Sequence, residues 1–311
     1  MRETVIVEAV RTPVGKRNGG LSDMHAADLS AIVLDALAER AGIDPDIVDD
    51  VVWGCVSQVG DQSSNIGRYA VLAAGWPESI PGATVNRACG SSQQALDFAV
   101  QAVMSGQQDV VVAGGVEVMS RVPLGSARAT GMPYGPKVLA RYGDFSFNQG
   151  LSAELISQKW GFSRTRLDEY SARSHELAAK AQDDGAFETQ IMPVFADGEP
   201  VVADEGIRRG TTVEKLAGLK PAFKEDGVIH AGNSSQISDG AAALLVMTAE
   251  NAIAMGLTPI VRYRAGAVTG ADPVLMTRMI NHMRDNGIRF GLQTMCEGGG
   301  TANATLVELI A

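Results

Sequence analysis

The chain has 311 residues, of which 45% are hydrophobic and 20% charged, and its formal net charge is −10. Such a chain can bury one large core or the cores of two ordinary domains, as globular proteins do. No basic run is present to follow a phosphate backbone, and apolar runs such as residues 241–247 are far too short to cross a bilayer, so the sequence predicts neither a nucleic-acid nor a membrane partner.

The three cysteines, Cys55, Cys89 and Cys296, are odd in number and lack the spacing of metal ligands. This argues against a disulfide framework and predicts no metal site. The first ten residues show a short strand pattern instead of a cationic segment with a long apolar stretch, so nothing in them indicates secretion. We therefore expect a cytoplasmic protein, with Cys55 as a core residue inside its apolar run.

Strand and helix patterns alternate through the first third of the chain. In chain order, we expect a strand at residues 5–10, a helix at 27–41, a strand at 51–56, a helix at 66–74, a short strand before residue 86, a helix at 93–104 and a strand at 109–115. Alternation with short links is typical of a layered α/β domain. The last of these strands is a continuous apolar run, which is typical of a strand buried on both faces.

The pattern changes between residues 120 and 232, where glycine, proline and charged residues interrupt it. Amphipathic helices are expected there at 153–159 and 166–183. The polar stretch 231–243 then leads into a buried strand that ends at residue 248. We interpret 120–240 as a domain inserted between the two parts of the first domain, 1–119 and 241–258.

Residues 259–311 make up the last predicted domain. Their pattern predicts a strand at 260–270, a helix at 272–286 that ends at Gly287, a strand at 290–295 and a final strand at 304–310.

Cys89 lies in the small-residue turn Asn86-Arg87-Ala88-Cys89-Gly90, between a short strand and a long helix. The free N–H groups and the dipole of a helix start favour a thiolate over a thiol. Ligands of α/β sheets also gather at the carboxyl ends of strands, where this turn is expected to lie. The pattern therefore indicates a nucleophile, although most cysteines are simply small buried hydrophobic residues.

Cys296 also ends a predicted strand, and glycines follow it closely. Backbone N–H groups beside Cys89 and Cys296 can form an oxyanion hole when they point at a developing oxyanion. Two thiols at one cleft suggest acyl transfer, in which one sulfur carries the acyl group and the other moves a proton. The polar loop 231–243 either binds a ligand through backbone and hydroxyl groups or is an ordinary turn.

Five motifs follow one another along the chain. They are Val7-Glu8-Ala9-Val10-Arg11-Thr12-Pro13-Val14-Gly15, Asn86-Arg87-Ala88-Cys89-Gly90-Ser91, Ala113-Gly114-Gly115-Val116-Glu117-Val118-Met119-Ser120, residues 231–243, and Cys296-Glu297-Gly298-Gly299-Gly300. In this order, and over nearly the whole chain, they resemble the thiolases, the acetyl-CoA acetyltransferase and 3-ketoacyl-CoA thiolase family.

The resemblance implies an α/β fold of thiolase type, layered α-β-α-β-α with an inserted loop domain and, here, a truncated second half. It implies that Cys89 takes the acyl group from an acyl-CoA as a thioester. Cys296 would remove a proton from the second acetyl-CoA or return one to it, and the N–H groups of Cys89 and Gly298 would form the oxyanion hole. The implied contacts with the substrate and CoA are Arg208, Leu219, Phe223, Ala231 and Ser235.

The family resemblance also sets the expected partners. These are acyl-CoA and CoA in fatty acid metabolism, bound by a homodimer or homotetramer, and no cofactor is expected because the CoA thioesters are substrates. Where the family often has a His-Met pair in the loop domain, this chain has Asn148-Gln149, which leaves its acyl-chain preference open.

Two catalytic motifs of the family, an Asn-Glu-Ala-Phe stretch and a Gly-His-Pro stretch, do not occur in the sequence. The chain follows the family pattern up to Met276, and Thr277 corresponds to a much later position of that pattern. This indicates an internal deletion of about two βα units between the two residues. None of the four histidines stands in a Gly-His-Pro turn, and His230 is the one expected nearest to the site. We therefore expect impaired turnover, unpaired sheet edges and uncovered apolar helix faces.

Two alternatives remain. The chain is either an acyltransferase of the thiolase family or an inactive remnant that binds CoA or pairs with an intact subunit. The ketoacyl synthases share the fold and the nucleophile but use two histidines in place of the second cysteine, so Cys296-Glu297-Gly298-Gly299 speaks against them.

Overall fold

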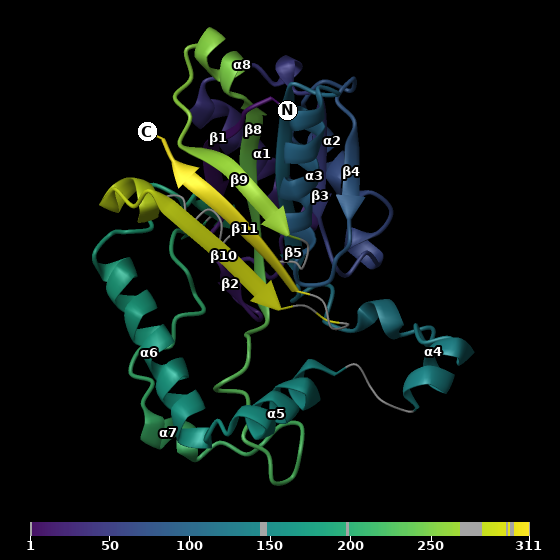
Figure 1. The fold of residues 1–311 in the computed structure, drawn as a ribbon, viewed down its shortest axis with the longest axis vertical. Coiled ribbons are helices and arrows are strands. Elements are labelled where there is room, and N and C mark those ends of the chain that lie inside the picture. The colour runs from purple at the N-terminus through teal and green to yellow at the C-terminus, as the bar shows by residue number, and fades with distance from the viewer. Residues whose placement is uncertain are drawn as a thin grey trace.

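A computed structural model describes residues 2–143, 148–196, 199–267, 282–296, 298 and 302–310 of the chain. Its main sheet contains β1 (Thr4–Arg11), β2 (Gly15–Lys16), β3 (Asp50–Gly54), β4 (Gly82–Val85), β5 (Val110–Val118), β8 (Ser238–Thr248), β9 (Val261–Ala267), β10 (Phe290–Cys296) and β11 (Ala302–Leu309). The strand order is β10-β11-β9-β1-β8-β5-β3-β4, with β2 beside β8 (Figure 1).

The first part of this sheet has helices on both faces. Helices α1 (Ala26–Ala41) and α2 (Ile66–Ala73) share one core with Val110, Val112 and Val116 of β5. Helix α3 (Ser91–Ser105) shares the other core with Val111 and Ala113. Successive strand residues point to opposite faces, so an uninterrupted apolar run such as β5 fits a strand covered on both sides. The predicted α/β fold is confirmed.

Helix α3 is also covered on its second side, by β9, β10 and β11, which cross over the first strands in Figure 1. Val100 of α3 belongs to the same core as Val261 and Val307. The Gln93 side chain donates a hydrogen bond to Thr305 of β11. The helix that follows Cys89 is therefore buried between two layers of strands, and its first turn is the end closest to the candidate nucleophile.

The strands of the second half repeat part of the first half. Strands β9, β11 and β10 pair antiparallel in the same order as β1, β8 and β5. Beside β5 the first half adds β3 and then β4, whereas β10 is the end of the sheet within the described residues. This agrees with a truncated second half. The proposed junction between Met276 and Thr277 lies outside the described residues.

The expected helices and strands occur in the predicted order, and several of their ends differ. Helix α5 begins at Gln149 instead of residue 153, and β5 ends at Val118 instead of residue 115. Strand β8 begins at Ser238, so the second part of the predicted loop 231–243 is already strand. Its first residues pair with β5 and β2, for example Asp239 with Val118 and with Gly15, and such distant pairing leaves no local signal in the sequence. Of the predicted helix 272–286, residues 282–286 are helical, and 272–281 lie outside the described residues.

The region between β5 and β8 contains most of the remaining elements. They are α4 (Pro136–Tyr142), α5 (Gln149–Trp160), α6 (Arg164–Asp183), β6 (Val194–Ala196), β7 (Glu199–Val201) and α7 (Val213–Ala217), and α8 (Ala249–Ala254) follows β8. Helices α4 to α7 lie beyond one end of the main sheet, with α4 apart from α6 and α7 (Figure 1). In the part of the chain that the structure describes, no helix has the length and apolar character needed to cross a membrane. The three domain boundaries stay a prediction.

Asp97 gives the contact between α3 and β9 a pH dependence. Burial raises the pKa of its carboxyl to about 6, although Tyr263 donates a hydrogen bond to Oδ1 at 2.9 Å. The folded chain thus holds this proton more tightly than the unfolded chain, so the stabilisation is present at low pH and is lost as the pH rises through 6. Relative to Asp97→Asn, we expect the free energy of unfolding of the natural chain to fall by about 3 kcal/mol between about pH 4 and pH 7. Urea unfolding curves measure it; a constant difference would contradict the prediction.

Candidate active site at the start of helix α3

The turn before α3 holds Cys89 in a tight and locally strained conformation. Asn86 Oδ1 accepts the N–H of Ala88 at 2.9 Å, and Ser91 Oγ accepts the N–H of Arg87 at 2.9 Å. Ala88 has a φ of 46°, in the left-handed region that costs a residue with a Cβ roughly 1–2 kcal/mol. The Cys89 side chain is exposed. Its position is therefore fixed by the turn instead of by burial of the sulfur.

Two glycines let α3 approach the sheet closely. A Cβ on Gly54 of β3 would lie 2.3 Å from the backbone N of Ser92, and one on Gly115 of β5 would lie 2.1 Å from its Oγ. Neither position has space for a larger residue, so the start of α3 lies directly on the strand ends. This contact fixes how far Cys89 lies from the ends of β3 and β5.

Cys89 opens into a cavity of about 450 Å³, which we call the Cys89 cavity. Its walls come from the β3 end, the β5 end and the loop before β8, including Ser57, Glu117 and Ser235. Ser235 is one of the substrate contacts implied by the family resemblance. The cavity joins three segments that are far apart in the sequence at the carboxyl ends of parallel β3 and β5, where ligands of α/β sheets bind.

Glu117 organises the deep side of this cavity. Its carboxylate accepts hydrogen bonds from the N–H of Val56 at 2.9 Å, the N–H of Ser57 at 3.2 Å and Nε2 of Gln62 at 2.7 Å. Burial, and then the negative charge of Glu117, raises the pKa of the Cys55 thiol. Cys55 is buried, as predicted, and stays protonated, which leaves Cys89 as the exposed thiol of the cavity. The sequence motif contained Glu117 but gave no reason to single it out.

Gly298, which follows β10 closely, lies beside the Cys89 turn. Cys296 is the last residue of β10, where it pairs with Ala302. A Cβ built on Gly298 would lie 3.7 Å from the Cβ of Ala88, the residue just before Cys89. One residue of each cysteine motif, from distant parts of the sequence, is therefore brought side by side. The position of the Cys296 thiol lies outside the described residues.

Three of the implied CoA contacts lie beside glycines of the inserted region. The Phe223 ring packs on the backbone of Gly150, near the start of α5, where a Cβ would lie 2.2 Å from the ring. Leu219 packs against Gly232, with 2.7 Å to a Cβ at that position, and Ala231 is the exposed neighbour of this glycine. Of the polar loop that follows, Ser235 lines the Cys89 cavity.

Arg208 lies at a different cavity. This second cavity has a volume of about 520 Å³ and lies between the C-terminal part of α6 and residues 208–211. Its lining includes His175, Lys180 and Arg209, and the backbone N–H of Arg208 donates to His175 Nδ1 at 3.2 Å. Arg208 is exposed there, in a lining that mixes Lys180 and Arg209 with the carboxylates of Glu176, Asp183 and Asp184. The structure does not bring it into the wall of the Cys89 cavity.

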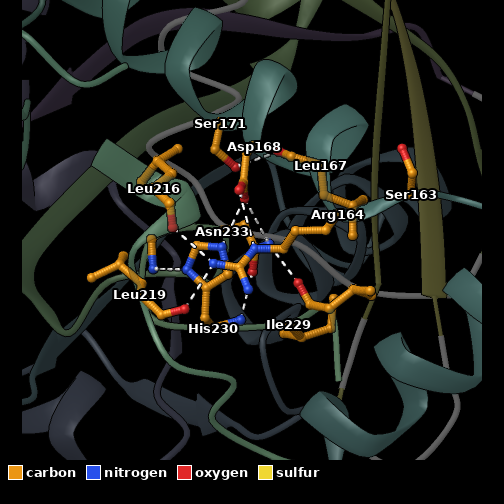
Figure 2. Close-up of polar contacts among 12 residues, drawn as sticks. Ser163, Arg164, Leu167, Asp168, Ser171, Leu216, Leu219, Ile229, His230 and Asn233 are labelled. Atoms are coloured by element: carbon orange, nitrogen blue, oxygen red, sulfur yellow. Dashed lines mark hydrogen bonds and ion pairs between the residues drawn. The ribbon is translucent and has the colours of Figure 1, made fainter. Parts of the chain in front are cut away.

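His230, the histidine expected nearest to the site, is held in a buried network (Figure 2). Its Nδ1 accepts the N–H of Gly232 at 3.0 Å, so its Nε2 carries the proton that is donated to Asp168 Oδ1 at 2.7 Å. Arg164 donates to the other oxygen of Asp168 at 3.1 Å, and Asn233 donates to its Oδ1 at 3.2 Å. Both ring nitrogens are used, so His230 orders the start of the polar loop and is unsuited to act as a base for Cys89.

The other three histidines are also occupied elsewhere. His25 caps α1 by accepting the N–H of Ala27, His175 contacts Arg208, and His282 contacts Asn286. Burial, and then the charge of Arg208, lowers the pKa of His175. Across the described residues, no histidine lines the Cys89 cavity, and no group of three or more His, Cys, Asp or Glu side chains is placed to hold a metal ion.

Comparisons with known proteins agree with this geometry. Residues 4–250 match the family model "Thiolase, N-terminal domain". A steroid 3-ketoacyl-CoA thiolase of Mycobacterium tuberculosis is 38% identical, with 99% of this chain and 94% of that protein covered. A 3-ketoacyl-CoA thiolase of Idiomarina loihiensis is 44% identical over 89% of this chain and 72% of its own length.

A solved structure is also similar to this chain over its full length. The acetyl-CoA acetyltransferase of Bacillus anthracis has a TM-score of 0.89 and 29% identity, covering 100% of this chain and 99% of its own. The alignment with the Mycobacterium tuberculosis protein runs over 386 positions, although this chain has 311 residues, so that relative has residues without a counterpart here. Fold, motifs and similarity over nearly the whole length together show that the chain belongs to the thiolase family.

Proposed function

We propose that the chain is an acyl-CoA acyltransferase of thiolase type that forms an acyl-Cys89 intermediate. The observation that carries this proposal is the exposed Cys89 thiol, which opens into a cavity of about 450 Å³. Gly298 lies beside the turn that holds this thiol. The relatives named 3-ketoacyl-CoA thiolase and acetyl-CoA acetyltransferase support the same reaction class.

In the direction of thiolysis, the Cys89 thiolate attacks the 3-keto carbon of a 3-ketoacyl-CoA and forms a C–S bond. The bond between carbons 2 and 3 then breaks, and its electron pair goes to carbon 2, which takes a proton from the Cys296 thiol to give acetyl-CoA. The Cys296 thiolate then takes the proton of a second CoA thiol. The resulting CoA thiolate attacks the acyl-Cys89 carbonyl, and the shortened acyl-CoA leaves as Cys89 returns to a thiolate. The Claisen condensation is the reverse sequence.

The oxyanion formed at each attack needs hydrogen-bond donors. We assign this role to the backbone N–H groups of Cys89 and Gly298, as the family resemblance implies. The close approach of Gly298 to the Cys89 turn, with 3.7 Å between the Ala88 Cβ and a Cβ placed on Gly298, supports this assignment. Donors fixed in position before the reaction stabilise the developing charge without reorganisation.

The CoA substrate would contact the side chains of Leu219 and Phe223 and the polar loop that holds Ala231 and Ser235. Ser235 lines the Cys89 cavity, and Phe223 packs on Gly150 of α5. Arg208 would contact the nucleotide end of CoA, as the family resemblance implies. No cofactor enters this proposal, because CoA thioesters are substrates. Homodimer or homotetramer formation, a cytoplasmic location and a role in fatty acid metabolism stay predictions.

Turnover is expected to be slow in this chain. The described residues include no histidine in the wall of the Cys89 cavity, and the sequence lacks the Gly-His-Pro motif that supplies the activating histidine in the family. These two observations also favour a second candidate, a catalytically inactive protein that binds CoA or pairs with an intact subunit. Formation of acyl-Cys89 separates the two.

The test is acylation of the thiol, which needs no complete turnover. We expect purified protein mixed with acetyl-CoA or acetoacetyl-CoA to gain the mass of one acetyl group, located on the Cys89 peptide by mass spectrometry. Cys89→Ala should lose the adduct, whereas Cys55→Ala should keep it because the Cys55 thiol is buried and its pKa is raised. Absence of an acyl-Cys89 adduct at saturating acyl-CoA would reject the acyltransferase in favour of the inactive protein.

A further inference from the structure

Gln149, the first residue of α5, contacts the nucleophile. Its Nε2 lies 3.6 Å from the Cys89 sulfur, at which distance the amide N–H donates a hydrogen bond to it. A thiolate is a stronger acceptor than a thiol, so a donor at this place favours the charged form of the sulfur. The contact joins the inserted region to the turn before α3, and it occurs where the family often has a methionine.

The start of α5 is held in place around Gln149. Asn148 Oδ1 accepts the N–H groups of Gly150 at 2.9 Å and Leu151 at 3.1 Å, which fixes the first turn of the helix. The Phe223 ring packs directly on Gly150. A donor on a fixed helix start loses less conformational freedom when it binds the sulfur than a donor on a free loop.

We propose that Gln149 is a catalytic hydrogen-bond donor, which holds the Cys89 sulfur through its amide N–H and stabilises the thiolate that attacks the acyl-CoA. This inference rests on the proposed function. An amide does not accept the thiol proton, which passes to solvent, so Gln149 supplies the donor part of an activating histidine but not its part as a base. Among the described residues no histidine lines the Cys89 cavity, and the Gln149 amide provides a hydrogen-bond donor beside the nucleophile.

Other charged groups around Cys89 are the same in every Gln149 variant. Glu117 and Asp239 line the cavity, and their carboxylates already accept hydrogen bonds from the β3 end and from Ser120. The charge of Arg87, two residues before Cys89, acts on Asp97. Differences between the natural chain and a Gln149 variant therefore report on the amide itself.

The experiment measures how fast Cys89 is alkylated by iodoacetamide at a series of pH values, with each cysteine peptide followed separately by mass spectrometry. In Gln149→Met the side chain keeps its approximate length and loses its donors. We expect Cys89 of this variant to be alkylated more slowly, with the midpoint of its rate curve moved up, because the thiolate loses a hydrogen-bond donor. Gln149→Glu should raise the midpoint further because it adds a negative charge. Gln149→His, which keeps an N–H donor, should bring the midpoint most of the way back to that of the natural chain.

Gln101→Met on the exposed face of α3 is the matched control and should leave the curve unchanged. Equal midpoints in the natural chain and in Gln149→Met, with both proteins showing the same thermal unfolding, would overturn the proposal. Alkylation needs no acyl-CoA, so this result is independent of the acylation test. A shifted midpoint without acyl-Cys89 formation would support the Gln149 donor and reject the acyltransferase.

Discussion

A chimera that carries, between Met276 and Thr277, the corresponding segment of the Mycobacterium tuberculosis relative is expected to cleave acetoacetyl-CoA at least about 10²-fold faster than the natural chain. A general base contributes roughly 10²–10⁴ to such a rate, and, as the family resemblance implies, the segment would supply the Gly-His-Pro histidine that this sequence lacks. The measurement is steady-state thiolysis, followed as loss of acetoacetyl-CoA in the presence of CoA.

The physical reason is that, within the described residues, the Cys89 cavity holds the nucleophile but no histidine in its wall. Cys89, its turn and the glycine contacts of α3 are in place, and Gln149 offers an N–H donor to the sulfur. His230 cannot take the proton because Asp168 and Gly232 occupy its two ring nitrogens. The same segment would also add strands beside β10, which ends the sheet within the described residues.

Two control chimeras separate these effects. One carries the segment with its Gly-His-Pro histidine changed to alanine, and should gain stability from the added strands but little of the rate. The other combines the intact segment with Cys89→Ala and should be inactive. Ordinary thiolase turnover by the natural chain itself would contradict the prediction, since it would show that another group takes the proton.

The sequence predicted the fold well where patterns were local. Helix α3 and strand β5 follow directly from their apolar periodicity, and the turn at Cys89 from its small residues before a helix start. The start of β8 was missed because residues such as Asp239 and Gly240 look like loop residues and become strand only by pairing with β5. Pairing between distant segments depends on tertiary packing, which a single sequence does not reveal.

The roles assigned to the site residues stay predictions, but the structure shows where several of these residues lie. Both cysteine motifs were identified, and the structure brings Gly298 against the Cys89 turn. The contact between Gln149 and Cys89 could not be predicted, because it requires the inserted region to fold back over the first sheet. Arg208, by contrast, lies at a separate cavity, a placement that the spacing of motifs does not encode.

Breaking the ion pair between Arg11 and Asp204 is expected to have the largest effect on stability. Arg11 is the last residue of β1 and belongs to the first family motif. Its guanidinium donates to both Asp204 oxygens, at 2.7 and 3.1 Å, and to Gln190 at 2.8 Å. The side chains of Arg11 and Asp204 are 0% and 2% exposed. Arg11→Met takes the guanidinium hydrogen bonds from the buried Asp204 carboxylate, so it should lower the free energy of unfolding by about 3–5 kcal/mol, a large share of the roughly 5–15 kcal/mol that holds a typical domain.

The position of this pair gives the prediction a second consequence. Asp204 Oδ1 also accepts the N–H of Val14, and the backbone of Arg11 bonds to Gln190 and Met192, so the pair ties the inserted region to the first sheet. The double variant Arg11→Met with Asp204→Leu leaves no unpaired charge and should lose less stability than Arg11→Met alone. The matched control is Arg209→Met, which breaks a similar two-bond pair with Asp183 on the surface and should leave the unfolding midpoint in urea almost unchanged. Equal losses in the buried and the surface variants would mean that Arg11 does not hold the inserted region to the sheet that carries Cys89.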